Sequence, residues 1–235
     1  GARRGLGLLP PPSPGDMVLD FEGDPLGETP LDYLFGVLLF GEREVEYCRW
    51  WAHTPREEAR AFEALVDLAT RRLDAHPDMH IYHYGHYEVS ALRRMMGAHA
   101  TREEALDRLL RSNVFVNLQL VVQQGLQVGT ASLSLKDVER LVRPAREEAV
   151  ADALDSMVQY EKWLALPPSE AKKRRAILDD IERYNRADCQ STADLCAWLR
   201  EQQARAGAVW VPPARAGGQT TARAVAAEEA LAAEL

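Results

Sequence analysis

The sequence predicts an α/β fold in which a mixed five-stranded sheet is covered by helices on both faces. Three apolar segments follow one another at residues 17–22, 33–40 and 44–51, as consecutive strands do. Two shorter strand-like segments, 80–83 and 114–116, are separated by helical patterns. Neighbouring strands followed by strands that alternate with helices favour a mixed sheet over a regular βαβ series.

The second and third strands are expected to form a hairpin, because only Gly41-Glu42-Arg43 separates them. The first strand is expected to end in a turn at Gly23-Asp24-Pro25. The chain carries no GxGxxG or GxxxxGK[ST] loop, so the sequence disfavours dinucleotide and nucleoside-triphosphate sites.

The helices are predicted from their start signals and their apolar period. Thr54 and Pro55 are expected as the N-cap and first residue of a helix that ends near residues 76–77. Thr101 and Glu104 have the spacing of a capping box, which predicts a second helix start. Further helices are expected at 88–96, 134–141, 147–164 and 169–203, the last two divided by Pro167-Pro168.

The chain of 235 residues, 46% of them hydrophobic, is long enough for a substantial core. We expect one domain over residues 16–204, a Gly/Pro-rich linker over 1–15 and a low-complexity tail over 205–235. The start lacks an initiator Met and a signal-peptide pattern, so we expect a piece of a longer protein.

Charge and cysteine content limit the functional classes. The net charge of −8 argues mildly against a broad nucleic-acid surface, although an acidic metal site would itself add negative charge. No apolar run is long enough to span a bilayer, so we expect no membrane partner. The three cysteines have no disulfide or zinc spacing, which indicates buried thiols and a cytoplasmic location; they are Cys48, Cys189 and Cys196.

The main functional signal is the pair Asp20 and Glu22 on the first strand. Side chains alternate along a strand, so both carboxylates point to one face and Phe21 to the other. Two neighbouring carboxylates on a buried strand repel each other and are costly to remove from water. A divalent cation between them would offset that cost, so the pair predicts half of a metal site.

Two later segments supply candidates for the other half. Glu88 follows the fourth strand and opens a helix, where a carboxylate also has a structural explanation in the helix dipole. Tyr184 and Asp188 are four residues apart in the last long helix and share a face. A zinc site at the nearby histidines is disfavoured, because they have no Cys or HExxH companion; they are His80, His83 and His86.

In this order the motifs resemble those of DEDD-type 3′–5′ exonucleases of the RNase H-like superfamily, in the subclass with a tyrosine. They are most similar to the RNase H-like domain found in bacterial RecB-like nuclease and helicase fusion proteins. The matching segments are Val18-Leu-Asp-Phe-Glu-Gly-Asp-Pro25, His83-Tyr-Gly-His-Tyr-Glu88, Phe115-Val-Asn-Leu118, Ser134-Leu-Lys136 and Tyr184-Asn-Arg-Ala-Asp-Cys189.

The resemblance implies an RNase H-like exonuclease domain over 16–204 and two Mg²⁺ or Mn²⁺ ions as cofactors. The implied metal ligands are Asp20, Glu22, Glu88 and Asp188, and the implied water-orienting residue is Tyr184. Leu26, Tyr33, His86 and Tyr87 would contact the terminal base, although core packing explains Tyr33 equally well. Asp24 and Asn117 are candidate neighbours of the metals.

Two positions depart from the family pattern. Glu88 stands where the family usually has Asp, and Asn117 stands where we expect Asp. Either change would alter or weaken the metal site.

We therefore expect a metal-dependent 3′–5′ exonuclease that removes nucleoside 5′-monophosphates from single-stranded DNA or RNA ends. Its expected partners are nucleic acid and the helicase or RecB-like nuclease domains of a longer parent chain. The alternatives are endonuclease action at the same site and a catalytically weakened module that binds nucleic acid or joins domains. The four retained acids favour catalysis.

Overall fold

The computed structural model describes residues 3–25, 30–41, 45–144, 150 and 153–213. Strands and helices follow in the order β1 (Met17–Asp24), β2 (Leu31–Phe40), β3 (Val45–Trp51), α1 (Pro55–Ala75), β4 (Ile81–His83), α2 (Tyr87–His99), α3 (Glu103–Arg111), β5 (Phe115–Asn117), α4 (Leu118–Gly125), α5 (Leu135–Glu139), α6 (Ala153–Ala165) and α7 (Ala171–Arg205). Two short 3₁₀ helices, η1 (Gly5–Leu8) and η2 (Pro168–Glu170), complete the list.

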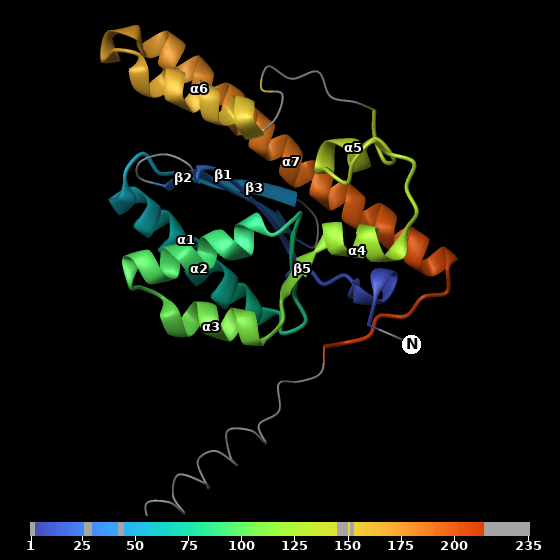
Figure 1. Cartoon of the computed structure of the whole chain (residues 1–235). Coiled ribbons are helices and arrows are strands. Elements are labelled where there is room, and N and C mark those ends of the chain that lie inside the picture. Colours follow the sequence, from blue (N-terminus) through green and yellow to red (C-terminus); the bar gives the residue numbers. More distant parts are fainter. Residues whose placement is uncertain (1–2, 26–29, 42–44, 145–149, 151–152, 214–235) are drawn as a thin grey trace, which may run out of the picture.

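The five strands form one mixed sheet in the order β3-β2-β1-β4-β5. The pairs β1–β2 and β2–β3 are antiparallel, whereas β1–β4 and β4–β5 are parallel. The predicted α/β class with a mixed five-stranded sheet is therefore confirmed. The short strand β5 lies at the open edge, beside α4 (Figure 1).

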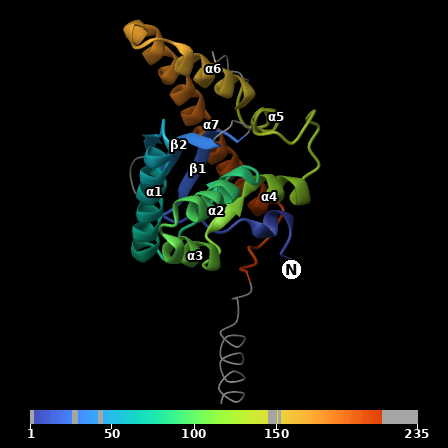
Figure 2. The ribbon, with the colours of Figure 1, turned by 60° about the vertical axis from the view of Figure 1, so that its left-hand side comes forward.

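Helices cover both faces of the sheet, as the two views of the ribbon show (Figures 1 and 2). On one face α1, α2 and α3 pack on side chains that include Met17, Leu19 and Phe21. On the other face α4, α5, η1 and the C-terminal half of α7 pack on side chains that include Val18 and Leu38. The sheet alternation thus separates two cores, and the even-numbered side chains of β1 face α7.

Local signals explain most element boundaries. Thr54 is the N-cap of α1, where its side chain accepts a hydrogen bond of 3.2 Å from the Glu57 amide. Ser134 caps α5 in the same way, through the Asp137 amide. Cys189 and Cys196 are buried thiols on α7, as expected, and Cys48 is half-buried.

Two local predictions need correction. The expected capping box at Thr101 does not form: α3 starts at Glu103, its N-cap is Arg102 in a left-handed conformation, and the Thr101 hydroxyl donates to Glu63 instead. The expected turn at residues 23–25 is wrong, because β1 continues through a bulge to Asp24.

Helix α4 was not predicted. It begins directly after β5, with Asn117 as its N-cap and no Gly or Pro between the two elements.

The expected linker and tail meet each other on the domain. Leu6 of η1 and Leu9 are buried in the core beneath α4 and α7. The amide of Val211 donates to the carbonyl of Gly7 over 2.9 Å, so the two ends of the described chain run side by side (Figure 1). Residues 42 and 43 of the predicted hairpin turn, residues 147–149 and 151–152 of the helix predicted from 147, and residues 214–235 lie outside the described residues.

None of the helices within the described residues is long and apolar enough to cross a membrane.

Candidate metal centre

Strand β1 supplies two carboxylates to the α7 face of the sheet. Glu22 is buried and Asp20 is half-buried, while Phe21 between them packs into the core under α1. The predicted division of these three side chains between the two faces is therefore found in the structure.

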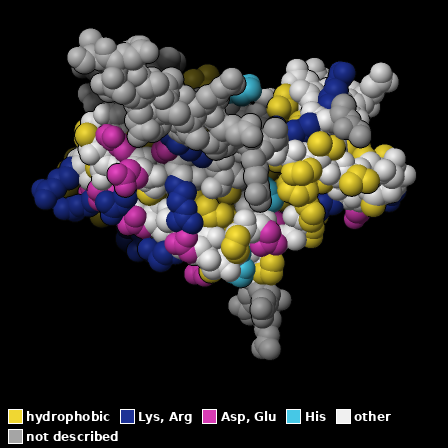
Figure 3. All heavy atoms as spheres, turned by 90° about the horizontal axis from the view of Figure 1, so that it is seen from below, with side chains coloured by type: hydrophobic (Ala, Val, Ile, Leu, Met, Phe, Trp, Pro, Cys, Tyr) yellow, Lys and Arg dark blue, Asp and Glu magenta, His cyan; other side chains and the backbone are white. Residues whose placement is uncertain are grey.

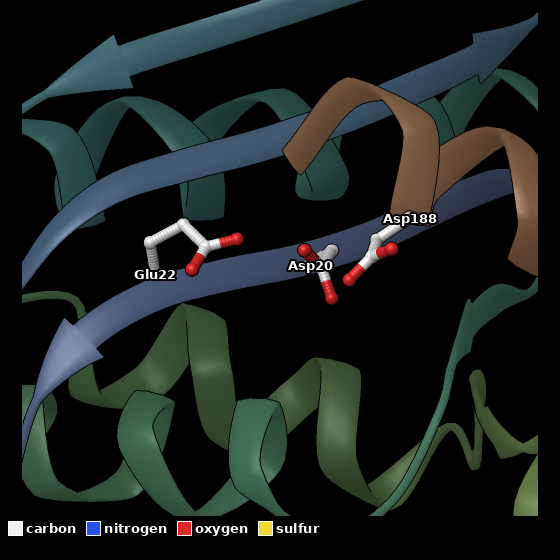
Figure 4. A group of neighbouring side chains, drawn as sticks. All are labelled: Asp20, Glu22 and Asp188. Atoms are coloured by element: carbon white, nitrogen blue, oxygen red, sulfur yellow. The ribbon is translucent and has the colours of Figure 1, made fainter. Parts of the chain in front are cut away.

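Helix α7 brings the third carboxylate. One oxygen from each of Asp20, Glu22 and Asp188 lies within 4.8 Å of the other two. Figure 4 shows the carboxylate of Asp188 descending from the helix onto Asp20, with the carboxylate of Glu22 pointing along the strand toward them. In the part of the chain that the structure describes, no other group of acids, histidines or cysteines has this arrangement.

Asn185 is a site residue that the sequence reasoning missed. Its fully buried amide nitrogen donates to the Asp20 carboxylate over 2.7 Å and to the Asp20 carbonyl over 3.1 Å, and approaches Glu22 at 3.5 Å. The Tyr47 hydroxyl donates to Oδ1 of the same amide over 2.8 Å, which fixes its orientation. The amide therefore holds the two strand carboxylates in place without bringing in a charge.

Gly36 makes room for this amide. It lies opposite Asp20 in the β1–β2 pair, and a Cβ atom at this position would lie 1.7 Å from Oδ1 of Asn185. Any larger residue would push α7 away from the sheet. The signal in the sequence was a lone glycine within an otherwise apolar strand, which is typical of a close backbone approach.

The pKa of Glu22 is raised, and no positively charged side chain is among the described neighbours that shift it. Burial, together with the negative charges of Asp188 and Glu88, raises the pKa of Glu22 to about 8, while hydrogen bonds from Ser156 and Asn185 act in the opposite direction. Ionising this carboxyl in the metal-free protein is therefore costly, and a bound cation would remove the cost.

Tyr184 lies one helical turn before Asp188 and touches the same group. Burial raises the pKa of its phenol, and the charges of Asp188, Glu22 and Asp20 and a hydrogen bond to Asp188 reinforce the effect. The hydroxyl consequently stays protonated and donates to the Asp188 carboxylate.

Lys136 is a second residue whose role the sequence reasoning did not assign. Its ammonium lies 5.3 Å from the centre of the Tyr184 ring. Helix α5 is held against α7 because Ser191 donates to Glu139 over 2.6 Å and Arg143 donates to Ser191 over 3.1 Å. A positive charge is thereby held over the ring of Tyr184.

Glu88 is close to the group but not part of it. Its buried carboxylate lies 3.4 Å from Nδ1 of His83, and its charge contributes to the raised pKa of Glu22. Neither Oε2 of Glu88 nor Nδ1 of His83 has a hydrogen-bond partner among the described residues. The fourth expected ligand thus has a buried oxygen available to a ligand, at the margin of the other three.

Asn117 and Tyr87 have structural contacts away from the metal group. The side-chain Oδ1 of Asn117 accepts hydrogen bonds from the backbone amides of Gly85 and Leu120, so it joins the start of α2 to the cap of α4. The Tyr87 hydroxyl donates to Asp32 over 2.6 Å, on the α1 side of the sheet. The structure therefore does not bring these two candidates together with the three clustered carboxylates.

The remaining candidates lie as follows. His86 is exposed at the start of α2, and Asp24 is half-buried at the end of β1. Tyr33 is fully buried and stacks on Tyr160 with ring centres 3.9 Å apart, which favours its core role. Leu26 lies outside the described residues.

The donors present fit a hard divalent cation. All three clustered ligands are carboxylates, the donor type that Mg²⁺ and Mn²⁺ prefer. The raised pKa of Glu22 and the unpartnered oxygen of Glu88 both point to a missing positive charge. Asp20, Glu22 and Asp188 could therefore hold a metal ion.

A family model described as the RNase_H superfamily matches residues 17–200 of the chain. The match includes all five strands and most of α7, and hence the three clustered carboxylates. Searches of curated proteins and of solved structures gave no significant match.

Proposed function

The chain belongs to the RNase H superfamily, and on this basis we propose that it is a metal-dependent 3′–5′ exonuclease of single-stranded DNA or RNA. The proposal assigns it to the DEDD type with a catalytic tyrosine. One observation carries it: two carboxylates of β1 and one of α7 converge within 4.8 Å of one another, beside the hydroxyl of Tyr184.

In the proposed reaction water attacks the phosphorus of the terminal phosphodiester and the 3′-oxygen of the preceding nucleotide leaves. Two Mg²⁺ or Mn²⁺ ions held by Asp20, Glu22, Asp188 and Glu88 would activate the water and stabilise the charge on the leaving oxygen. The products are a nucleoside 5′-monophosphate and a strand shortened by one unit.

The chain's own residues position the reactants. Tyr184 donates a hydrogen bond to Asp188, so its oxygen can accept a hydrogen bond from the attacking water and orient it. Lys136 can neutralise a non-bridging phosphate oxygen from its place beside the Tyr184 ring. Asn185 keeps the carboxylates of Asp20 and Glu22 in a fixed orientation.

The test uses 3′- and 5′-labelled single-stranded DNA and RNA with Mg²⁺, Mn²⁺ or EDTA. Asp20→Asn and Asp188→Asn should abolish the metal-dependent ladder. Asp179→Asn is the matched control, because Asp179 lies on the same helix and pairs with Arg175 at the surface. Equal residual activity in both site variants would identify a contaminant and overturn the proposal.

Tyr184→Phe tests the orientation of the water. It should lower kcat by about 10- to 100-fold and leave KM unchanged, because the phenol contacts the reacting water and not the strand. A circular single strand distinguishes the alternative endonuclease, since only an endonuclease cuts a substrate without ends.

A second candidate function is a module that binds nucleic acid or joins domains without catalysis. It is favoured by the position of Glu88 outside the three-carboxylate group and by the structural contacts of Asn117. Metal binding in calorimetry together with no cleavage of any strand would support it.

We also propose that the domain works beside the helicase or RecB-like nuclease domains of a longer parent chain. The face seen in Figure 3 supports this, because basic and acidic side chains are interspersed on its left, where α1, α2 and α3 lie, and hydrophobic ones gather toward the right. Such a surface gives weak attraction for a polyanion, so neighbouring domains would supply affinity. We therefore expect this chain alone to bind single-stranded nucleic acid weakly, even at low salt.

A further inference from the structure

A pocket lies at the open edge of the sheet, outside the metal group. Its volume is 370 Å³, within the range of about 300–1,000 Å³ that is typical of small-molecule sites. Its walls come from β5, the outer side of α2, the N-terminal segment and the C-terminal segment that runs beside it.

The charge of this pocket is opposite to that of the chain. The protein has a net charge of −8, yet the pocket lining, as far as the structure describes it, includes Arg3 and Arg93 and no Asp or Glu. Neither guanidinium has an ion pair or hydrogen bond within the described residues. Two free guanidinium groups around one cavity favour an anion, and their planar donor geometry suits phosphate.

The rest of the lining suits an aromatic group. Phe115 and Trp210 face the cavity, and their rings make edge contacts with His83 at 6.3 Å and with His80 at 6.0 Å. Burial lowers the pKa of His80, so it offers the cavity a neutral ring. Aromatic and imidazole rings provide faces on which a nucleobase can stack.

The pocket also lies close to Glu88, the expected ligand outside the three-carboxylate group. His83 lines the pocket, is 3% exposed, and lies with Nδ1 3.4 Å from the Glu88 carboxylate without forming a hydrogen bond there. A molecule in the pocket would therefore lie one side chain away from Glu88.

We propose that this pocket binds a nucleoside monophosphate unit, with Arg3 and Arg93 on the phosphate and Phe115 and Trp210 beside the base. The unit can be a free nucleotide or one nucleotide of a strand. The inference does not depend on the proposed nuclease activity, because none of the three clustered carboxylates lines the pocket.

The test measures binding of deoxyadenosine 5′-monophosphate to the whole chain in EDTA, by calorimetry and by tryptophan fluorescence. The nucleotide should bind more tightly than deoxyadenosine or inorganic phosphate alone. Arg93→Ala should weaken binding at least about tenfold, because a charge-assisted contact is lost. Arg56→Ala is the matched control, since Arg56 is exposed on α1 and does not line the pocket.

Two further variants complete the design. Trp210→Phe should abolish the fluorescence change while the calorimetric affinity changes little. Asp20→Asn should bind the nucleotide as the wild type does, which separates failure of the pocket from failure of the nuclease proposal.

A competition experiment with an oligonucleotide decides whether the pocket binds a free nucleotide or one nucleotide of a strand. If a short single-stranded oligonucleotide displaces the nucleotide from the wild type but has no such effect on Arg93→Ala, the pocket takes a unit of a strand. Without displacement it takes the free nucleotide. No binding, or equal affinity in Arg93→Ala and Arg56→Ala, would overturn the proposal.

Discussion

The two faces of the sheet each bury a group of carboxylates, and the two groups are built differently. On the α1 face, Asp32 and Glu58 share Arg94, at 2.5 Å and 2.9 Å, and His99 lies 2.7 Å from Glu58. On the α7 face, Glu22 is bounded by Asn185, Ser156 and two further acids. The group on the α1 face contains its own cation, Arg94. In the group on the α7 face, the neighbours that shift the pKa of Glu22 are neutral hydrogen-bond donors and negatively charged carboxylates.

This difference separates a structural acidic group from a ligand site. Burial raises the pKa of Asp32, but hydrogen bonds and the charge of Arg94 oppose the rise. For Glu22 the neighbouring charges add to the effect of burial. On the α1 face the guanidinium compensates the charge of the buried carboxylates within the protein itself. On the α7 face, ionisation of the buried carboxylates becomes favourable only when a cation binds.

The largest expected effect is on the α1 face. Arg94→Met should lower the free energy of unfolding by about 3 kcal/mol, because Asp32 and Glu58 would remain buried without their cation. Metal affinity should not change. Chemical denaturation and calorimetry measure the two quantities, and a loss of metal affinity with unchanged stability would invert the comparison.

The next effect is on the α7 face. Glu22→Gln should weaken Mg²⁺ or Mn²⁺ binding more than about 100-fold, since it removes a ligand rather than a residue that supports one. Glu58→Gln is the matched control, being a buried glutamate of the other group. Comparable losses in calorimetry for both variants would show that the two groups are not distinct.

The pH dependence of stability sharpens the same contrast. The folded metal-free protein keeps a proton on Glu22 up to about pH 8, whereas the unfolded chain releases it near 4.5. The contribution of Glu22 to the free energy of unfolding should therefore fall as pH rises from 4.5 to about 8, and then level off. Subtracting the denaturation profile of Glu22→Gln isolates this slope; a flat difference would contradict the raised pKa.

The smallest expected effect concerns Tyr47. Tyr47→Phe removes the donor that fixes Asn185, which should cost about 1 kcal/mol of stability and a few-fold in metal affinity. Tyr84→Phe is the control, because the Tyr84 hydroxyl makes one hydrogen bond of the same length to the Leu133 carbonyl. Similar metal affinity in the two variants would show that the orientation of Asn185 does not contribute to metal binding.

Local patterns predicted much of the fold and part of the site. The alternation along β1 separates Asp20 and Glu22 from Phe21, and capping by Thr54 sets the start of α1. The grouping of Asp20, Glu22 and Asp188 was expected from the carboxylates on the first strand and the last helix and from the family resemblance, and the structure brings these three together.

What the sequence could not predict depends on contacts between distant segments. Asn185 acts through a gap that Gly36 leaves in the neighbouring strand, so its role requires the β1–β2 register and the rotation of α7. Thr101 donates to Glu63 of α1, a contact that no local capping rule contains. Helix α4 follows β5 without a break signal, so its apolar residues gave no boundary.

Gly36 also fixes how α7 packs on the sheet beside the site. Because Gly36 has no side chain, there is a gap on this face of the sheet, and the amide of Asn185 fills it. With one turn of α7 seated in this way, Asp188 on the next turn is carried to Asp20 by the stiffness of the helix alone. The packing of α7 on the sheet therefore prearranges the three carboxylates, so binding a cation requires little further movement of the chain.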